Sequence, residues 1–259
     1  MISLKHLLSE QLDFSGFKMN KTLNPKIWTD DMIMSTDIRK TLLQIANDYI
    51  NALKVKVKLK DITLTGSLAN FNWSKYSDVD LHILVDLSQL GDEVDTIKDL
   101  LDSDTRSWNT EHDIKIKGYD VELYIQLHDQ EHHSSGVYSI LNNDWILKPK
   151  KQNVTIDKKN VVKKYNDIVN TVNDIHDEFV NAQNYDDVIK RLNTLREKIK
   201  KTRTAGLETE GEYSIENIVF KLIRRNNIMG KIKDMLVKAY DKSMTIDEER
   251  MLPITEADF

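Results

Sequence analysis

The chain has 259 residues, of which 40% are apolar and 31% are charged, and its formal net charge is -5. This composition is typical of a folded globular protein and excludes a disordered chain. The lack of cysteine excludes disulfides, thiolate metal sites and a cysteine nucleophile. No run approaches the ~20 apolar residues that span a membrane, so we expect a cytoplasmic protein without a membrane partner.

The charge is unevenly distributed along the chain. Residues 1–150 carry 17 basic and 23 acidic residues, whereas residues 151–259 carry 20 and 19. Pro149 and the lysine-rich stretch around it mark a boundary between these parts. We therefore predict two domains, 1–150 and 151–259, with a metal site in the acidic one and contact with a polyanion in the other.

The first domain mixes helical and strand-like patterns. Apolar residues recur at three or four positions from about 37 to 53 and again from 94 to 101, which predicts two helices. Alternating apolar residues predict strands, which are expected at 55–64, 79–85, 114–116, 121–127 and 137–140.

The second domain has only helical patterns. Apolar stripes at helical spacing predict four helices, over 161–179, 188–199, 214–223 and 228–239. Two glycines within 205–212 indicate a loop between the second helix and the third. We expect an α+β protein with a C-terminal helical bundle.

The segment 65–85 carries the clearest chemical pattern. Gly66 ends a strand and permits a sharp turn that exposes backbone N–H groups. Ser67 adds a hydroxyl and opens a helix, whose N-terminus favours phosphate. Alone, this pair would indicate only a turn and a helix cap.

Asp78 and Asp80 then begin a strand at a spacing of two. Side chains alternate across a strand, so the two carboxylates share one face. Because two neighbouring carboxylates repel unless a cation lies between them, the pair predicts a Mg²⁺ site, which Mn²⁺ would also fit. Two such ions activate an attacking hydroxyl and stabilise a leaving pyrophosphate.

A two-metal site needs a third carboxylate, and the strand at 120–127 offers two. Asp120 and Glu122 point to the same face, so alternation does not separate them. We favour Glu122, because it lies within the strand, whereas Asp120 lies at the turn. The alternative is that Glu122 belongs to a solvated strand face.

Other residues have competing interpretations. We favour a structural hydrogen bond over metal contact for His82. We also favour a plain loop leading into a strand for Ser134–Tyr138, over a nucleotide pocket with Tyr138 stacked on a base. Two basic clusters of the helical half are either solvated helix faces or contacts for triphosphate or RNA. They are Lys190, Arg191, Arg196, Lys198, Lys200, Lys201 and Arg203, and Lys221, Arg224 and Arg225.

The order of Gly66-Ser67, Asp78-Val79-Asp80 and a later strand carboxylate resembles the polymerase-beta-like nucleotidyltransferase superfamily. The resemblance covers mainly residues 60–127, and residues 74–81 look especially like members with a small catalytic domain. It implies a mixed sheet flanked by helices, in which Gly66 and Ser67 hold phosphate and Asp78 and Asp80 ligate both metals. The third carboxylate would act as base or ligand for the acceptor hydroxyl. This chain offers Glu122 where one common pattern has Asp, and its helical half resembles the accessory bundles of these enzymes.

The resemblance implies transfer of a nucleoside monophosphate from a nucleoside triphosphate, ATP among them, to an acceptor hydroxyl, with release of pyrophosphate. The acceptor alternatives are an RNA end, a protein side chain, a second nucleotide or a small molecule. Two other functions compete: a catalytically inactive module of the same fold that binds nucleotide or RNA, and a hydrolase that releases inorganic phosphate.

Overall fold

A computed structural model describes residues 12–88, 93–130, 134–182 and 184–245. The chain divides into two compact units, Phe14–Val154 and a second one that groups Thr155–Phe259 with Met1–Asp13. No helix of the described residues is long and apolar enough to cross a membrane.

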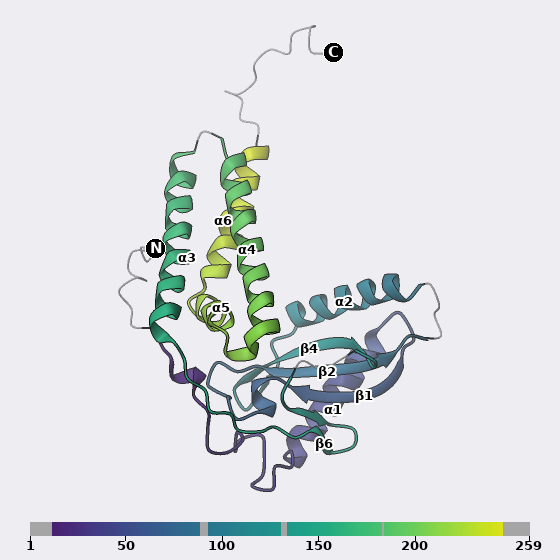
Figure 1. Ribbon diagram of the computed structural model, residues 1–259. Helices are drawn as coiled ribbons and strands as arrows, with labels where there is room; N and C mark the ends of the chain where they lie inside the picture. Colours follow the sequence, from purple (N-terminus) through teal and green to yellow (C-terminus); the bar gives the residue numbers. More distant parts are fainter. Residues whose placement is uncertain (1–11, 89–92, 131–133, 183, 246–259) are drawn as a thin grey trace. The chain divides into compact units, whose positions relative to one another are not determined.

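The first unit is built around a sheet of six described strands in the order β3-β4-β2-β1-β5-β6. The strands β2 and β4 are parallel, and the other neighbouring strands are antiparallel, so the sheet is mixed (Figure 1). The strands are β1 (Lys58–Thr65), β2 (Val79–Asp86), β3 (Lys115–Ile116), β4 (Tyr119–Leu127), β5 (Val137–Ser139) and β6 (Asp144–Leu147). Two α-helices accompany them, α1 (Thr36–Ala52) and α2 (Val94–Glu111), along with the 3-10 turns η2 (Ser15–Phe17) and η3 (Ser67–Ala69).

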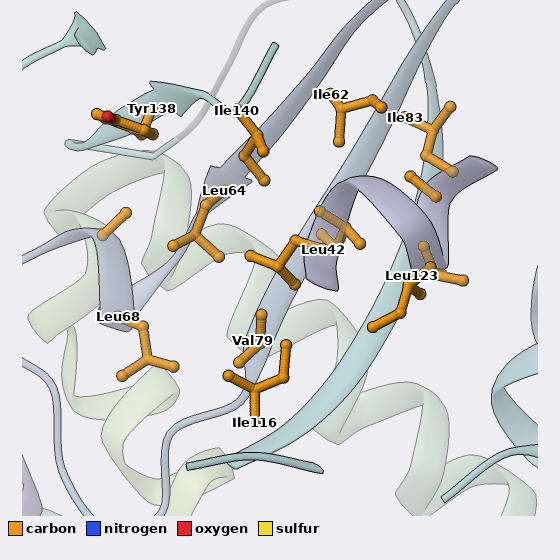
Figure 2. Close-up of a cluster of buried hydrophobic side chains, with 14 of the residues drawn as sticks. Leu42, Ile62, Leu64, Leu68, Val79, Ile83, Ile116, Leu123, Tyr138 and Ile140 are labelled. Atoms are coloured by element: carbon orange, nitrogen blue, oxygen red, sulfur yellow. The ribbon is translucent and has the colours of Figure 1, made fainter. Parts of the chain in front are cut away.

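Strand register gives the sheet an apolar face. Leu64 of β1 is paired with Leu81 of β2, which in turn is paired with Leu123 of β4. These three side chains are almost fully buried, and Leu42 of α1 packs into the same core (Figure 2). The period of two seen in the sequence therefore reports which face of each strand is inside.

The same register gives the opposite face a polar character. Thr65 is paired with Asp80, and Asp80 is paired with Glu122. His82, two residues beyond Asp80 on β2 and on the same face, is paired with Tyr124. The candidate site residues therefore lie on one face of adjacent strands, away from the apolar core.

The second unit consists of four described α-helices, α3 (Lys158–Asn181), α4 (Asp186–Glu210), α5 (Ile215–Arg225) and α6 (Ile228–Met244), with the 3-10 turn η5 (Gly211–Tyr213). Their apolar stripes pack together, with α4 against α3, α5 and α6. Side-chain caps begin two of them: Asp157 accepts a hydrogen bond from the Asn160 N–H at α3, and Ser214 accepts one from the Asn217 N–H at α5. The predicted C-terminal helical bundle is confirmed.

The loop predicted over 205–212 is wrong. Helix α4 continues to Glu210, and only Gly211, with φ 74°, leaves the helical conformation. Gly206 lies inside the helix, where a Cβ would come within 2.8 Å of the Ser214 hydroxyl. A glycine within a helix costs only ~1 kcal/mol relative to alanine, so Gly206 does not have to interrupt α4. The close packing of Ser214 explains why a glycine stands at this position.

Candidate active site

Gly66 lies at the end of β1, directly against Asp80. Its φ of 70° and ψ of -159° turn the chain out of the strand. A Cβ at this position would lie 1.8 Å from Oδ2 of Asp80 and 2.9 Å from its Cγ. Both the positive φ and the lack of a side chain are therefore needed for this carboxylate to lie where it does.

Asp80 and Glu122 are register partners on the parallel strands β2 and β4. Neighbouring strands are ~4.8 Å apart, so partners on one face have adjacent side chains. Asp78 precedes β2 by one residue and has the same parity as Asp80. All three side chains are partly buried. Asp80 and Glu122 therefore have neighbouring positions on the polar face, and Asp78 lies just before the start of β2.

The Tyr124 hydroxyl is close to these carboxylates. It donates a hydrogen bond to Oε2 of Glu122. Burial and this hydrogen bond raise the pKa of Tyr124 above its ordinary value, and the charges of Glu122, Asp80 and Asp78 add to the shift. Alternation along β4 puts Tyr124 on the same face as Glu122, but no local pattern in the sequence indicates this contact.

Asp120 has a different environment. It lies at the start of β4, opposite Lys115 of β3, and its carboxylate forms an ion pair with the Lys115 ammonium. Lys115 also lies 3.0 Å from Asp113. Asp120 is exposed at the hairpin and paired with a cation of its own, whereas Glu122 is bonded to a neutral hydroxyl.

Ser67 joins the two turns that flank the site. Its hydroxyl donates a hydrogen bond of 2.7 Å to the hydroxyl of Ser77, which also accepts one from the Ser74 N–H. The expected helix after Gly66 is only the single 3-10 turn Ser67–Ala69. A helix dipole is a sum over several turns, so any phosphate contact here depends on hydroxyl and N–H groups rather than on a helix N-terminus.

The loop before β5 closes on this turn. The Ser134 hydroxyl accepts a hydrogen bond of 3.2 Å from the Gly66 N–H, and the Asn70 side-chain amide donates to the Ser135 hydroxyl. The Gly66 N–H, expected to be exposed, is thus engaged by a side chain. Only the polarity of the run 134–136 signalled this in the sequence, because the contact spans 68 residues.

Tyr138 is part of the core. It is 1% exposed, and its ring packs edge-on against Trp28 and Trp145, at centroid distances of 4.8 and 5.0 Å. Its hydroxyl donates to Asn143. The interpretation of Tyr138 as a base-stacking residue is therefore excluded, and a loop leading into strand β5 is confirmed.

His82 makes the structural contacts that we favoured. Its Nδ1 lies 3.0 Å from Oε1 of Gln126, and its ring stacks on Tyr124 with centroids 4.9 Å apart and an interplanar angle of 26°. Strand pairing brings these three side chains together, since His82 and Tyr124 are register partners.

The acidic residues have the ligand chemistry of a divalent-cation site, because Mg²⁺ and Mn²⁺ prefer carboxylate oxygens. Within the described parts of the chain, however, no three His, Cys, Asp or Glu side chains form a group that could hold a metal ion. Carboxylates that share a site repel one another without a cation. The three residues fit an ion in the chemistry of their oxygens and in their positions on and beside the two strands, and in this structure they do not converge on one point.

Several basic residues of the helical unit have partners within that unit. Arg191 forms an ion pair with Glu178, and the Lys221 ammonium lies 3.0 Å from the carboxylate of Glu212. The Arg203 guanidinium lies 4.1 Å from the ring centroid of Phe220. These contacts account for part of the two basic clusters without a polyanion.

The family model of the nucleotidyltransferase domain matches residues 47–190. The match covers more than half of the chain and includes β1, β2 and β4 with Asp78, Asp80, Asp120 and Glu122. The chain therefore belongs to the nucleotidyltransferase domain family, as the polymerase-beta-like resemblance implied. No match was found among curated proteins or among solved structures.

Proposed function

We propose that this protein transfers a nucleoside monophosphate from a nucleoside triphosphate to an acceptor hydroxyl, with the unit Phe14–Val154 as its catalytic domain. The observation that carries the proposal is the pairing of Asp80 with Glu122 on adjacent strands of a nucleotidyltransferase domain, with Asp78 one residue before the strand of Asp80. The helical unit is proposed as an accessory domain, and the cytoplasm as the location.

In the proposed reaction, Asp78, Asp80 and Glu122 would hold Mg²⁺ or Mn²⁺. When bound there, such an ion would supply activation of the acceptor hydroxyl and charge stabilisation for the leaving pyrophosphate. Ser67 and the backbone of its turn hold the phosphates, and Gly66 leaves space for Asp80 beside them. Catalysis is then mainly positioning and charge stabilisation.

The bonds that change are those at the α-phosphorus. The acceptor oxygen forms a bond to that phosphorus as the bond to the oxygen bridging the α- and β-phosphates breaks. The acceptor proton passes to Glu122, which lies beside Asp80 on the neighbouring strand, and the electron pair of the broken bond leaves on pyrophosphate. We favour Glu122 over Asp120 for this role, because the Asp120 carboxylate is already paired with Lys115.

The test is release of pyrophosphate from each of the four ribonucleoside triphosphates, with Mg²⁺ or Mn²⁺, in the presence and absence of bulk RNA. We expect metal-dependent release by the wild type and none by Asp80→Asn. Stimulation by RNA would support an RNA acceptor. Tight nucleotide binding that is independent of metal and without turnover would instead support the inactive binding module.

A further inference from the structure

On the polar face of the sheet, the side chain of His82 contacts those of Tyr124 and Gln126 next to the carboxylates. Tyr124 lies two residues beyond Glu122 on β4 and donates its hydroxyl hydrogen to Oε2 of Glu122. The Tyr124 ring stacks on His82 of β2, and His82 contacts Gln126 of β4. Figure 1 shows the two strands side by side.

These contacts fix the position of the Tyr124 hydroxyl. A tyrosine side chain has only two rotatable bonds, and stacking on His82 restricts both of them. Tyr124 as a whole residue is 38% exposed, so its side chain is not part of the buried core. Its structural role in the unit is therefore small, and its hydroxyl is aimed at a single acceptor.

Glu122 is the residue that gains most from such a contact. A glutamate has one more rotatable bond than an aspartate, so ordering its side chain costs more conformational entropy. We propose that Tyr124 is a positioning residue that holds the Glu122 carboxylate beside Asp80 for a divalent cation. It thereby compensates for the length of glutamate at this position.

The charge of the partner supports this role. The phenol is neutral at physiological pH, so its hydrogen bond orients the Glu122 carboxylate without neutralising it. By contrast, Asp120, which lies on β4 with Glu122, forms an ion pair with the ammonium of Lys115 on β3. A carboxylate has two oxygens, so Glu122 can keep one bonded to Tyr124 while the other ligates an ion. Carboxylates that ligate metals commonly have such hydrogen-bonded partners.

The inference rests on the proposed metal site, and its test measures binding as well as turnover. We would titrate the full-length wild type and Tyr124→Phe with Mn²⁺ in the presence of a non-hydrolysable nucleoside triphosphate analogue, and follow free Mn²⁺ by electron paramagnetic resonance. Tyr124→Phe keeps the ring and removes only the hydroxyl. We expect its Mn²⁺ dissociation constant to rise by roughly tenfold, with an unchanged melting temperature. Tyr240→Phe, at an exposed position of α6, is the matched control and should bind as the wild type does.

A double-mutant cycle identifies the residue through which Tyr124 acts. If it acts by positioning Glu122, then adding Tyr124→Phe to Glu122→Gln should weaken Mn²⁺ binding by less than twofold beyond Glu122→Gln alone. An equal loss in both backgrounds would overturn the inference, as would unchanged or tighter binding by the single Tyr124→Phe variant.

Asp80→Asn separates failure of this inference from failure of the proposed function. If Asp80→Asn weakens Mn²⁺ binding but Tyr124→Phe does not, the metal site stands and the positioning role is wrong. If Asp80→Asn binds Mn²⁺ as well as the wild type does, the proposed metal site is wrong, and the positioning role falls with it. When the nucleotide concentration is varied at a fixed, limiting Mn²⁺ concentration, Tyr124→Phe should also lower the apparent kcat more than it changes the apparent KM for the nucleotide.

Discussion

A methyl group at Gly66 would lie 1.8 Å from the carboxylate oxygen Oδ2 of Asp80. The glycine that ends β1 and the carboxylate that β2 presents beside it therefore depend on each other. Gly66 serves the site by leaving space for Asp80, in addition to turning the chain.

Gly66→Ala should consequently impair metal binding and turnover. The added Cβ displaces the Asp80 side chain, and a non-glycine residue at φ 70° costs ~1–3 kcal/mol of strain. Mn²⁺ titration and thermal unfolding would check both effects. Gly118→Ala is a matched control, because Gly118 also has a positive φ, of 90°, but a Cβ there meets nothing within 4 Å. It should lower the melting temperature and leave Mn²⁺ affinity unchanged, and a similar loss of affinity in both variants would contradict the specific role of Gly66.

Asp78→Asn and Asp80→Asn should each abolish turnover. Removing one negative charge from a group of carboxylates relieves their repulsion, so we expect melting temperatures equal to or above that of the wild type without metal. Pyrophosphate release and differential scanning calorimetry provide the two readouts. Full activity in either variant would exclude the metal site at this position.

Glu122→Gln and Asp120→Asn distinguish the two candidates for the third carboxylate. Glu122→Gln should eliminate pyrophosphate release, because an amide neither accepts the acceptor proton nor ligates a cation strongly. Asp120→Asn should retain activity, since it alters an exposed ion pair with Lys115 at the hairpin. The reverse pattern would identify Asp120, rather than Glu122, as the third carboxylate.

The ion pair between Lys164 of α3 and Glu216 of α5 predicts a pH dependence of stability in the helical unit. The hydrogen bond from Lys164 holds the pKa of Glu216 below its ordinary value of 4.5. The stabilisation is therefore fully present above about pH 4.5 and is lost as the pH falls through the lowered value. At neutral pH, Glu216→Gln should lower the melting temperature by roughly 1–2 °C.

The same difference should shrink when the pH falls from neutral to well below 4.5, because the Glu216 carboxylate of the wild type then becomes protonated. Thermal unfolding at both pH values tests this. Glu208→Gln, at an exposed position of α4, serves as the control and should behave as the wild type does at both. A Glu216→Gln effect of equal size at both pH values would show that the ion pair is not its source.

The sequence predicted the parts of the fold that depend on local pattern. Alternation along β2 and β4 correctly predicted both strands. The shared face of Asp78 and Asp80 stays a prediction, because Asp78 precedes β2. The spacing of apolar residues located the helices. The glycines at 206 and 211 suggested a loop, but the chain is helical up to Glu210 and Gly211 caps the helix. Composition does not reveal that Ser214 packs closely enough to require Gly206.

Several contacts of the site that the sequence did not reveal are long-range. Pairing of Asp80 with Glu122 depends on the parallel register of strands separated by a helix and a hairpin. The hydrogen bond from Gly66 to Ser134 depends on where β5 joins the sheet. Tyr138 resembled a pocket residue because it follows a polar run, yet its ring is buried among two tryptophans. Tertiary packing, rather than local pattern, determines each of these.

Incubation with a nucleoside triphosphate labelled on the γ-phosphate, with Mg²⁺ and a mixture of candidate acceptors, tests the central claim most directly. Nucleotidyl transfer breaks the bond between the α- and β-phosphates, so we predict that the label appears in pyrophosphate with the wild type and stays in the triphosphate with Asp80→Asn. Metal-dependent release of the label as inorganic phosphate would contradict transfer and indicate a hydrolase that uses the same carboxylates.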